Sequence, residues 1–165
     1  MKVCVDTAIL IDILKDESRA LQSNFYNALY AREKLIVPVV VFAELMPQFG
    51  GDAEQVAEFL SEHKISVAPL DIEAVSLAGA RWLRYLKQKT YAKCPSCGQK
   101  LERKEHFLSD FYIGGFALAQ CDVILTRDRG IYNKYFADLP LYSPAVRREE
   151  RPDGLQERSA KRHLA

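Results

Sequence analysis

The stretch from Ser109 to Asp128 constrains the fold more than any other, because it joins an apolar helix to a buried strand and carries a carboxylate near each end. Ser109 is a preferred N-cap residue, and the small and apolar run 111–120 predicts a helix. Residues 123–126 predict a short, fully buried strand. In a β-α-β unit the helix begins at the edge of the sheet where the strands end. We therefore expect Asp110 and Asp128 at that edge, where open α/β sheets bind their ligands.

Two further carboxylates follow predicted strands. Asp6 comes directly after the strand that opens the chain, and Glu44 lies about two turns into the helix that begins near Pro38. Asp6 taken alone has a simple alternative role, because aspartate is a preferred helix N-cap. Glu44 stands in the apolar run VVVFAEL, where a carboxylate is costly to bury unless it is paired or binds a metal. It is therefore either part of a site or half of a buried ion pair.

The rest of the hydrophobic pattern alternates short strands with amphipathic helices, which predicts an α/β fold with a central parallel sheet. A chain of 165 residues with 48% hydrophobic residues is long enough for one packed core. Asp12, Asp16 and His63 are expected on the surface. Further strands are predicted at 2–5, 35–37, 65–68 and 140–142, and helices at 8–14, 18–32, 39–49, from Asp52 on, at 71–88 and at 129–136.

Positive charge is concentrated in one segment. The formal net charge is only +1, but the segment 84–104 has an excess of six positive charges, which leaves a net charge of −5 on the rest. Any affinity for nucleic acid must therefore come from this local patch. The lysines expected to bind a substrate are Lys89, Lys93, Lys100 and Lys104. The alternative is a solvated loop, because most runs of charge have no other role.

The same segment contains Cys94-Pro-Ser-Cys97-Gly98, a turn with the form of half a zinc ribbon. A closed zinc site needs four ligands, and the nearest further candidate is His106. A nearby carboxylate or a second subunit could supply the last ligand. The alternative is a redox-active or incidental cysteine pair. Cys4 and Cys121 are expected to be buried as small apolar residues.

The candidate site acids come from four separate stretches, yet the topology brings them to one edge of the sheet. Clustered carboxylates repel one another, and a hard divalent cation, Mg²⁺ or Mn²⁺, is the best explanation for such a cluster. A bound ion of this kind activates water and neutralises the leaving oxygen in phosphodiester hydrolysis. The adjacent Thr7 and Thr126 either orient waters or carboxylates, or make local turn contacts. The four acids are Asp6, Glu44, Asp110 and Asp128.

At these residues the sequence resembles the PIN-domain ribonucleases, and especially the VapC-type toxins of toxin–antitoxin pairs. The resemblance covers roughly residues 1–142 and rests on four ordered motifs, VCVDTAILIDIL, IVPVVVFAEL, LSDFYIGGFALA and VILTRD. It implies a three-layer α/β/α fold and Mg²⁺-dependent cleavage of RNA, with the four acids as metal ligands. Gly114 and Gly115 stand where the family often has alanines, which points to closer helix packing.

The resemblance also frames the domain organisation and the partners. It implies a PIN-like nuclease domain at 1–142 with a basic, cysteine-containing insertion at 89–105 and a charged, flexible tail at 143–165. The expected partners are RNA, an antitoxin protein and a second copy of the chain. No apolar stretch is long enough for a membrane span and the N-terminus does not have the form of a signal peptide, so we expect a cytoplasmic protein without a membrane partner.

Two other functions compete with a ribonuclease. A catalytically silent RNA- or protein-binding module would use the cysteine-containing insertion for recognition, but it has no reason to keep costly clustered carboxylates. A phosphatase with Asp6 as nucleophile would usually carry a second acid two residues later, where this chain has Ala8. The acidic quartet therefore favours the nuclease.

Overall fold

The computed structural model describes residues 1–15, 25, 27–28, 31–88, 92–93, 96–98, 100–101 and 107–142. The predicted tail at 143–165 and Asp16 lie outside them. The strands are β1 (Lys2–Val5), β2 (Lys34–Pro38), β3 (Ile65–Ala68), β4 (Ala92–Lys93), β5 (Lys100–Leu101) and β6 (Val123–Leu125). The helices are α1 (Thr7–Lys15), α3 (Val39–Leu45), the 3₁₀ helix η1 (Met46–Phe49), α4 (Ala53–Glu62), α5 (Ile72–Gln88), α6 (Leu108–Gln120) and α7 (Arg129–Tyr135).

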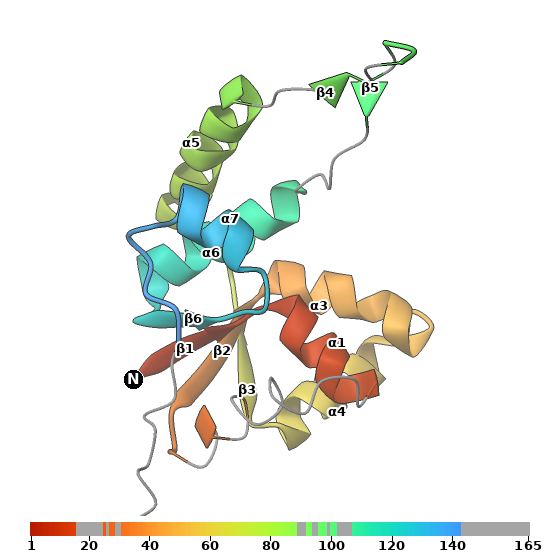
Figure 1. The fold of residues 1–165 in the computed structure, drawn as a ribbon. Coiled ribbons are helices and arrows are strands. Elements are labelled where there is room, and N and C mark those ends of the chain that lie inside the picture. The colour runs from red at the N-terminus through yellow and green to blue at the C-terminus, as the bar shows by residue number, and fades with distance from the viewer. Residues whose placement is uncertain are drawn as a thin grey trace, which may run out of the picture.

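Four parallel strands form the central sheet in the order β3-β2-β1-β6. The chain moves from β1 outward to β3 and then returns past β1 to β6, so right-handed crossovers place the connecting helices on both faces. Figure 1 shows α1, α3 and α4 on one side of the sheet and α5, α6 and α7 on the other. The predicted three-layer α/β/α architecture is confirmed.

The core consists of the residues that the hydrophobic pattern selects. Val3, Cys4 and Val5 of β1 are fully buried, as central strands of a parallel sheet require. Phe25 and Ala28, from the helix predicted at 18–32, are also fully buried. The two cysteines predicted to act as apolar residues do so, since Cys4 lies in β1 and Cys121 is partly buried at the end of α6.

Several local predictions are wrong. Helix α6 begins at Leu108 with Phe107 as its N-cap, so Ser109 lies inside the helix. The helix expected at 39–49 ends at Leu45 and continues as a 3₁₀ turn, in which Pro47 lies. His63 is partly buried because its ring packs 4.5 Å from that of Phe59 and its Nδ1 lies 2.8 Å from the Phe59 carbonyl oxygen. The strand expected at 140–142 is only a single bridge between Leu141 and Ile124.

Two adjacent glycines let α6 pack closely against its neighbours. A Cβ atom on Gly115 would lie 2.4 Å from the carbonyl oxygen of Ala74 in α5 and 2.9 Å from the backbone nitrogen of Ala78. A Cβ atom on Gly114 would lie 2.5 Å from the ring of Phe136. The close packing expected from Gly114 and Gly115 is thus confirmed, and it fixes the helix that carries Asp110.

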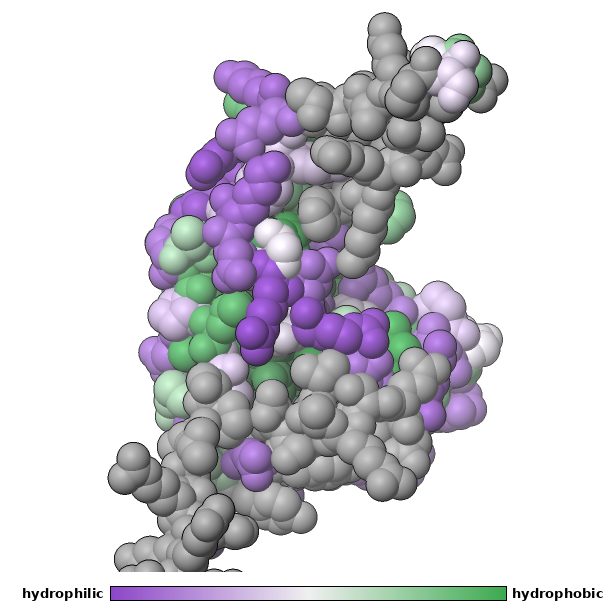
Figure 2. All heavy atoms as spheres, in the orientation of Figure 1, coloured by the Kyte–Doolittle hydropathy of each residue, from purple (hydrophilic) through white to green (hydrophobic). Residues whose placement is uncertain are grey.

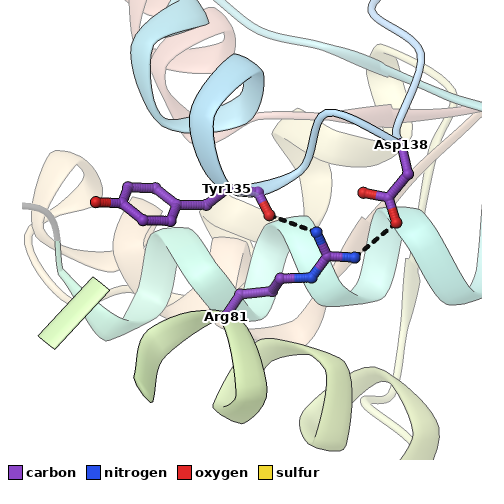
Figure 3. A network of polar contacts seen from close by, with 3 residues as sticks. All are labelled: Arg81, Tyr135 and Asp138. Atoms are coloured by element: carbon purple, nitrogen blue, oxygen red, sulfur yellow. Dashed lines mark hydrogen bonds and ion pairs between the residues drawn. The ribbon is translucent and has the colours of Figure 1, made fainter. Parts of the chain in front are cut away.

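Arg81 ties α5 to the C-terminal end of α7. Its guanidinium donates to the carbonyl oxygen of Tyr135 and to Oδ2 of Asp138, both at 2.6 Å (Figure 3). The hydrogen bond from Arg81 is the main reason why the pKa of Asp138 is lowered. The guanidinium carbon also lies 5.4 Å from the centre of the Phe136 ring. A cation at a helix C-terminus is favourable because the helix dipole is negative there, so these contacts hold α7 in place beside α6.

The described parts of the insertion form a short hairpin. Strands β4 and β5 pair antiparallel around the cysteine-containing turn, in which Cys97 is exposed and Gly98 adopts a φ of 71°. Glycine readily adopts this left-handed conformation because it has no Cβ atom. Cys94 and His106 lie outside the described residues, and zinc binding stays a prediction. No helix in the described part of the chain has the length and hydropathy of a membrane span.

The packing of α6 on α5 predicts opposite effects for two alanine substitutions. Gly115→Ala should destabilise the protein by about 1–3 kcal/mol, because the new methyl group meets the α5 backbone. Gly79→Ala is the matched control on α5, where a Cβ atom would have no neighbour within 4 Å. It should stabilise the helix by up to about 1 kcal/mol. Thermal or urea unfolding measures both, and equal effects would contradict the close contact.

Candidate active site

Asp6 is the centre of the candidate site, at the point where β1 ends. Its side chain is buried, with 7% of its surface exposed. The hydroxyl of Thr126, at the end of the neighbouring β6, donates to Asp6 Oδ2 at 2.5 Å. The same hydroxyl oxygen accepts the backbone N–H of Asp128 at 3.0 Å. Thr126 therefore links two predicted site acids. It bonds to Asp6, which lies 120 positions earlier in the chain, and to Asp128.

Glu44 is held by the other predicted threonine. The Thr7 hydroxyl, in the first turn of α1, donates a short hydrogen bond to Glu44 Oε2 on α3. Glu44 is partly buried, and within the described residues no lysine or arginine forms an ion pair with it or with Asp6. The alternative of a buried ion pair at Glu44 is thus wrong for this part of the chain.

Asp110 and Asp128 lie at the starts of α6 and α7. Asp110 is the third residue of α6, and its Oδ2 accepts the backbone N–H of Phe107 at 2.9 Å. Asp128 is the N-cap of α7, and its Oδ1 accepts the N–H of Gly130 at 3.1 Å. Carboxylates are favourable at both places because the first N–H groups of a helix are unsatisfied and its dipole is positive there. Each helix thus fixes one site acid.

Mutual repulsion shows that the acids are neighbours. Burial raises the pKa of Asp6 from 3.8 to about 6, the hydrogen bond from Thr126 opposes this increase, and the charges of Asp110 and Glu44 add to it. The sheet edge therefore carries more negative charge than its surroundings compensate.

Tyr132 of α7 is a residue that the sequence analysis missed. It is 1% exposed, and burial together with the charges of Asp6, Asp110 and Asp128 raises the pKa of its hydroxyl. An aromatic residue in an amphipathic helix gives no signal that its hydroxyl lies close to carboxylates. Its ring packs against Phe136, with 5.8 Å between centroids, so it forms part of the buried wall behind the acids.

Asp12 is a second correction, because it was predicted on the solvated surface. It is only 1% exposed, and its Oδ1 lies 2.8 Å from Nη1 of Arg127, in the loop between β6 and α7. The position of Asp12 on α1 turns it toward this loop, which the hydrophobic pattern of α1 alone does not reveal. In the space-filling view, hydrophilic residues gather at the centre of the face that Figure 1 presents (Figure 2).

The donor set suits a hard cation, although the side chains do not form a finished ligand group. Carboxylate and hydroxyl oxygens are the ligands that Mg²⁺ and Mn²⁺ prefer, and burial together with the charges of Asp110 and Glu44 raises the pKa of Asp6. Within the described residues, however, no three acidic, histidine or cysteine side chains are close enough together to hold an ion. The candidate ligands instead bond to threonine hydroxyls and helix N–H groups. The residues therefore fit such an ion in the chemistry of their oxygen donors, while within the described residues their side chains are not arranged around one point.

The predicted substrate-binding lysines cannot be placed. Lys89 and Lys104 lie outside the described residues, and only the backbone of Lys93 and Lys100 is described, in β4 and β5. Their role in gripping RNA stays a prediction.

A parallel sheet between two helical layers, with carboxylates where its strands end, defines an α/β/α protein with an acidic site. The sequence matches the model of the PIN domain over residues 3–137, so this chain belongs to the PIN-domain family. A search of curated proteins finds no significant match.

Two solved structures have a similar fold. One is VapBC2 from Rickettsia felis bound to a DNA fragment from its promoter, with a TM-score of 0.61, 14% identity, and 86% of this chain and 98% of that chain covered. The other is VapBC-1 from nontypeable Haemophilus influenzae, with a TM-score of 0.60, 20% identity, and 87% of this chain and 98% of that chain covered. At these identities the similarity shows the fold alone.

The raised pKa of Asp6 predicts how stability depends on pH. The folded protein holds the Asp6 proton up to about pH 6, whereas an unfolded chain releases it near pH 3.8, so stability falls as the pH rises between these values and stays level above them. In EDTA, Asp6→Asn should therefore gain stability relative to wild type over this interval, by on the order of 3 kcal/mol. Unfolding curves from pH 4 to 8 measure the difference.

The matched control is Glu58→Gln, at an exposed carboxylate on α4. Its stability relative to wild type should not change over the same interval. A constant difference between Asp6→Asn and wild type across the interval would show that Asp6 ionises normally.

Proposed function

We propose that this protein is a metal-dependent endoribonuclease that hydrolyses RNA phosphodiester bonds, and that it acts as the toxin of a toxin–antitoxin pair. The observation that carries the proposal is the buried Asp6 with Asp110 and Glu44 in its electrostatic field, at the carboxyl edge of a PIN-domain sheet. Two similar structures are of VapBC proteins, which supports the toxin assignment and an antitoxin partner.

Each side chain has a role in this proposal. Asp6, Glu44, Asp110 and Asp128 hold Mg²⁺ or Mn²⁺, which when bound activates water and neutralises charge on the leaving oxygen. Thr126 orients Asp6, and Thr7 orients Glu44, through the hydrogen bonds that their hydroxyls donate. Backbone N–H groups at the N-termini of α6 and α7 hold the carboxylates of Asp110 and Asp128 in place.

The catalytically silent binding module remains the alternative. It would have the same fold and bind RNA without cleaving it. An RNA cleavage assay therefore distinguishes the nuclease from the binding module, whereas an RNA binding assay does not. The acids favour the enzyme, because a buried carboxylate with a raised pKa lowers the stability of the fold, and a binding module has no function that requires it.

Asp110→Asn should reduce RNA cleavage at least about 100-fold, the order seen when one charge-stabilising group is removed from an active site. The fold should survive, because an asparagine oxygen can still accept the N–H of Phe107. In EDTA the melting temperature should not decrease, since one charge leaves a repelling cluster. Incubation of mixed RNAs with Mg²⁺, Mn²⁺ or EDTA measures cleavage.

Glu58→Gln is again the control and should cleave like wild type. Normal cleavage by folded Asp110→Asn, or undiminished wild-type cleavage in EDTA, would rule out the assigned site. No cleavage of any RNA by wild type with either metal would favour the binding module.

A homodimer is the partner that the surface of α5 supports best. Four exposed apolar residues and an exposed glycine share one face of this helix, spaced symmetrically about Gly79. The apolar residues are Ile72 (83% exposed), Val75 (37%), Leu83 (52%) and Leu86 (46%). We propose that a second copy packs antiparallel on this stripe, so that Ile72 of one copy meets Leu86 of the other and Val75 meets Leu83.

Charge supports the antiparallel arrangement. The exposed Glu73 lies at the start of α5, and the exposed Arg84 and Lys87 lie near its end. Two antiparallel copies bring the acidic end of one helix to the basic end of the other, whereas a parallel pair brings like charges together.

Leu83→Glu should weaken this dimer at least about tenfold, because it places a charge in an apolar contact on both copies. Sedimentation equilibrium over a range of concentrations measures the dissociation constant. Ala57→Glu, at an exposed position on α4, is the control and should dimerise like wild type. A monomeric wild type, or equal constants for the two variants, would contradict the α5 interface.

A further inference from the structure

Arg127 lies between two residues of the candidate site but has no role in the mechanism above. Its neighbour Thr126 donates to Asp6, and its other neighbour Asp128 caps α7. The arginine side chain is 53% exposed, whereas Asp12, to which it is bonded at 2.8 Å, is 1% exposed. A buried carboxylate thus fixes the guanidinium of a surface arginine beside the acids.

The simplest explanation is that Arg127 only neutralises Asp12. That explanation accounts poorly for the acid itself, which interrupts an otherwise apolar helix, AILIDIL. A buried ion pair rarely stabilises a fold more than apolar residues of the same size would, because desolvation offsets the attraction. The pair is better explained by its effect on Arg127, because Asp12 holds the guanidinium in a fixed position at the surface.

The position of the pair suits a polyanionic substrate. Asp12 is five residues after Thr7 on α1, so it lies about 7.5 Å further along the helix axis, and roughly 140° around the helix, from the residue that bonds Glu44. Arg127 itself lies between Thr126 and Asp128 in the chain, so its backbone is next to the acidic site, whereas its guanidinium is held at Asp12. The RNA phosphates on either side of the cleaved one are negatively charged, and a cation near the site would reduce their repulsion by the carboxylates.

We propose that Arg127, held in place by Asp12, is a positioning residue that binds an RNA phosphate next to the one that is cleaved. This inference rests on the proposed nuclease function. A guanidinium has five N–H donors in a fixed plane, so one bond to Asp12 leaves donors that match a phosphate. Because Asp12 already fixes the side chain, less conformational entropy is lost when the phosphate binds.

Arg127→Gln should raise KM for a short single-stranded RNA about tenfold and leave kcat within about twofold, since the residue binds substrate and not the reacting atoms. The slope of log K for RNA binding against log salt concentration should decrease in magnitude by about 1, as expected for the loss of one phosphate contact. Arg129→Gln is the matched control, because Arg129 is an exposed arginine two residues away in the same segment. It should change KM less than twofold.

A second variant separates substrate binding from stability. Arg127→Gln alone removes the ion pair between Arg127 and the buried Asp12 carboxylate, so the melting temperature of this variant should fall. The double variant Asp12→Asn, Arg127→Gln should recover much of the melting temperature, because an amide pair can hydrogen bond without charge. RNA affinity should stay as low as in the single variant.

The outcomes are distinct. Recovery of RNA affinity together with stability in the double variant would show a purely structural ion pair and overturn the proposal, as would equal effects of Arg127→Gln and Arg129→Gln. Binding of a fluorescent RNA oligonucleotide in EDTA tests Arg127 without turnover. If wild type binds RNA but cleaves none, the proposed function fails, and loss of binding in Arg127→Gln still supports the phosphate contact.

Discussion

Repulsion between carboxylates at one edge of a parallel sheet is the constraint on which the rest of the structure depends. Asp6 is buried at the end of β1 with Asp110 and Glu44 close enough to raise its pKa. The fold tolerates this charge because it supplies hydroxyls and helix N-termini around it: Thr126 donates to Asp6, and α7 begins at Asp128. These dipoles compensate part of the charge, and the uncompensated remainder is what a divalent cation would neutralise.

The hydrophobic pattern was sufficient to predict the sheet, its parallel strands and the edge at which the acids meet. Once the β-α-β order is known, a short buried apolar run has few possible places other than a strand of the parallel sheet. Asp6 and Asp128 follow such runs, so the topology alone places them at the carboxyl edge of the sheet. Details that depend on tertiary contact were not predictable. Asp12 looks like a surface residue in a helical pattern, and only the folded loop after β6 brings Arg127 over it.

The same limit applies to Tyr132 and Ser109. Tyr132 is an ordinary apolar position of α7 by its spacing, and its closeness to the acids follows only from how α7 docks. Ser109 is a good N-cap by residue type, but Asp110 accepts the N–H of Phe107, which places the cap two residues earlier. At the start of α6 a site carboxylate decides where the helix begins, although the helix propensities of the residues favour Ser109. At Tyr132 the packing of α7 decides which groups surround the hydroxyl.

The glycine contact between α5 and α6 explains how the chain carries an insertion directly before a site residue. The insertion leaves the domain after Gln88 and returns at Phe107, three residues before Asp110. Gly115 packs against the α5 backbone, and Arg81 holds α7 to the same helix, so α5 fixes both helices from the side opposite the sheet. A chain built in this way can vary in the segment between α5 and α6 while the acidic site keeps its geometry.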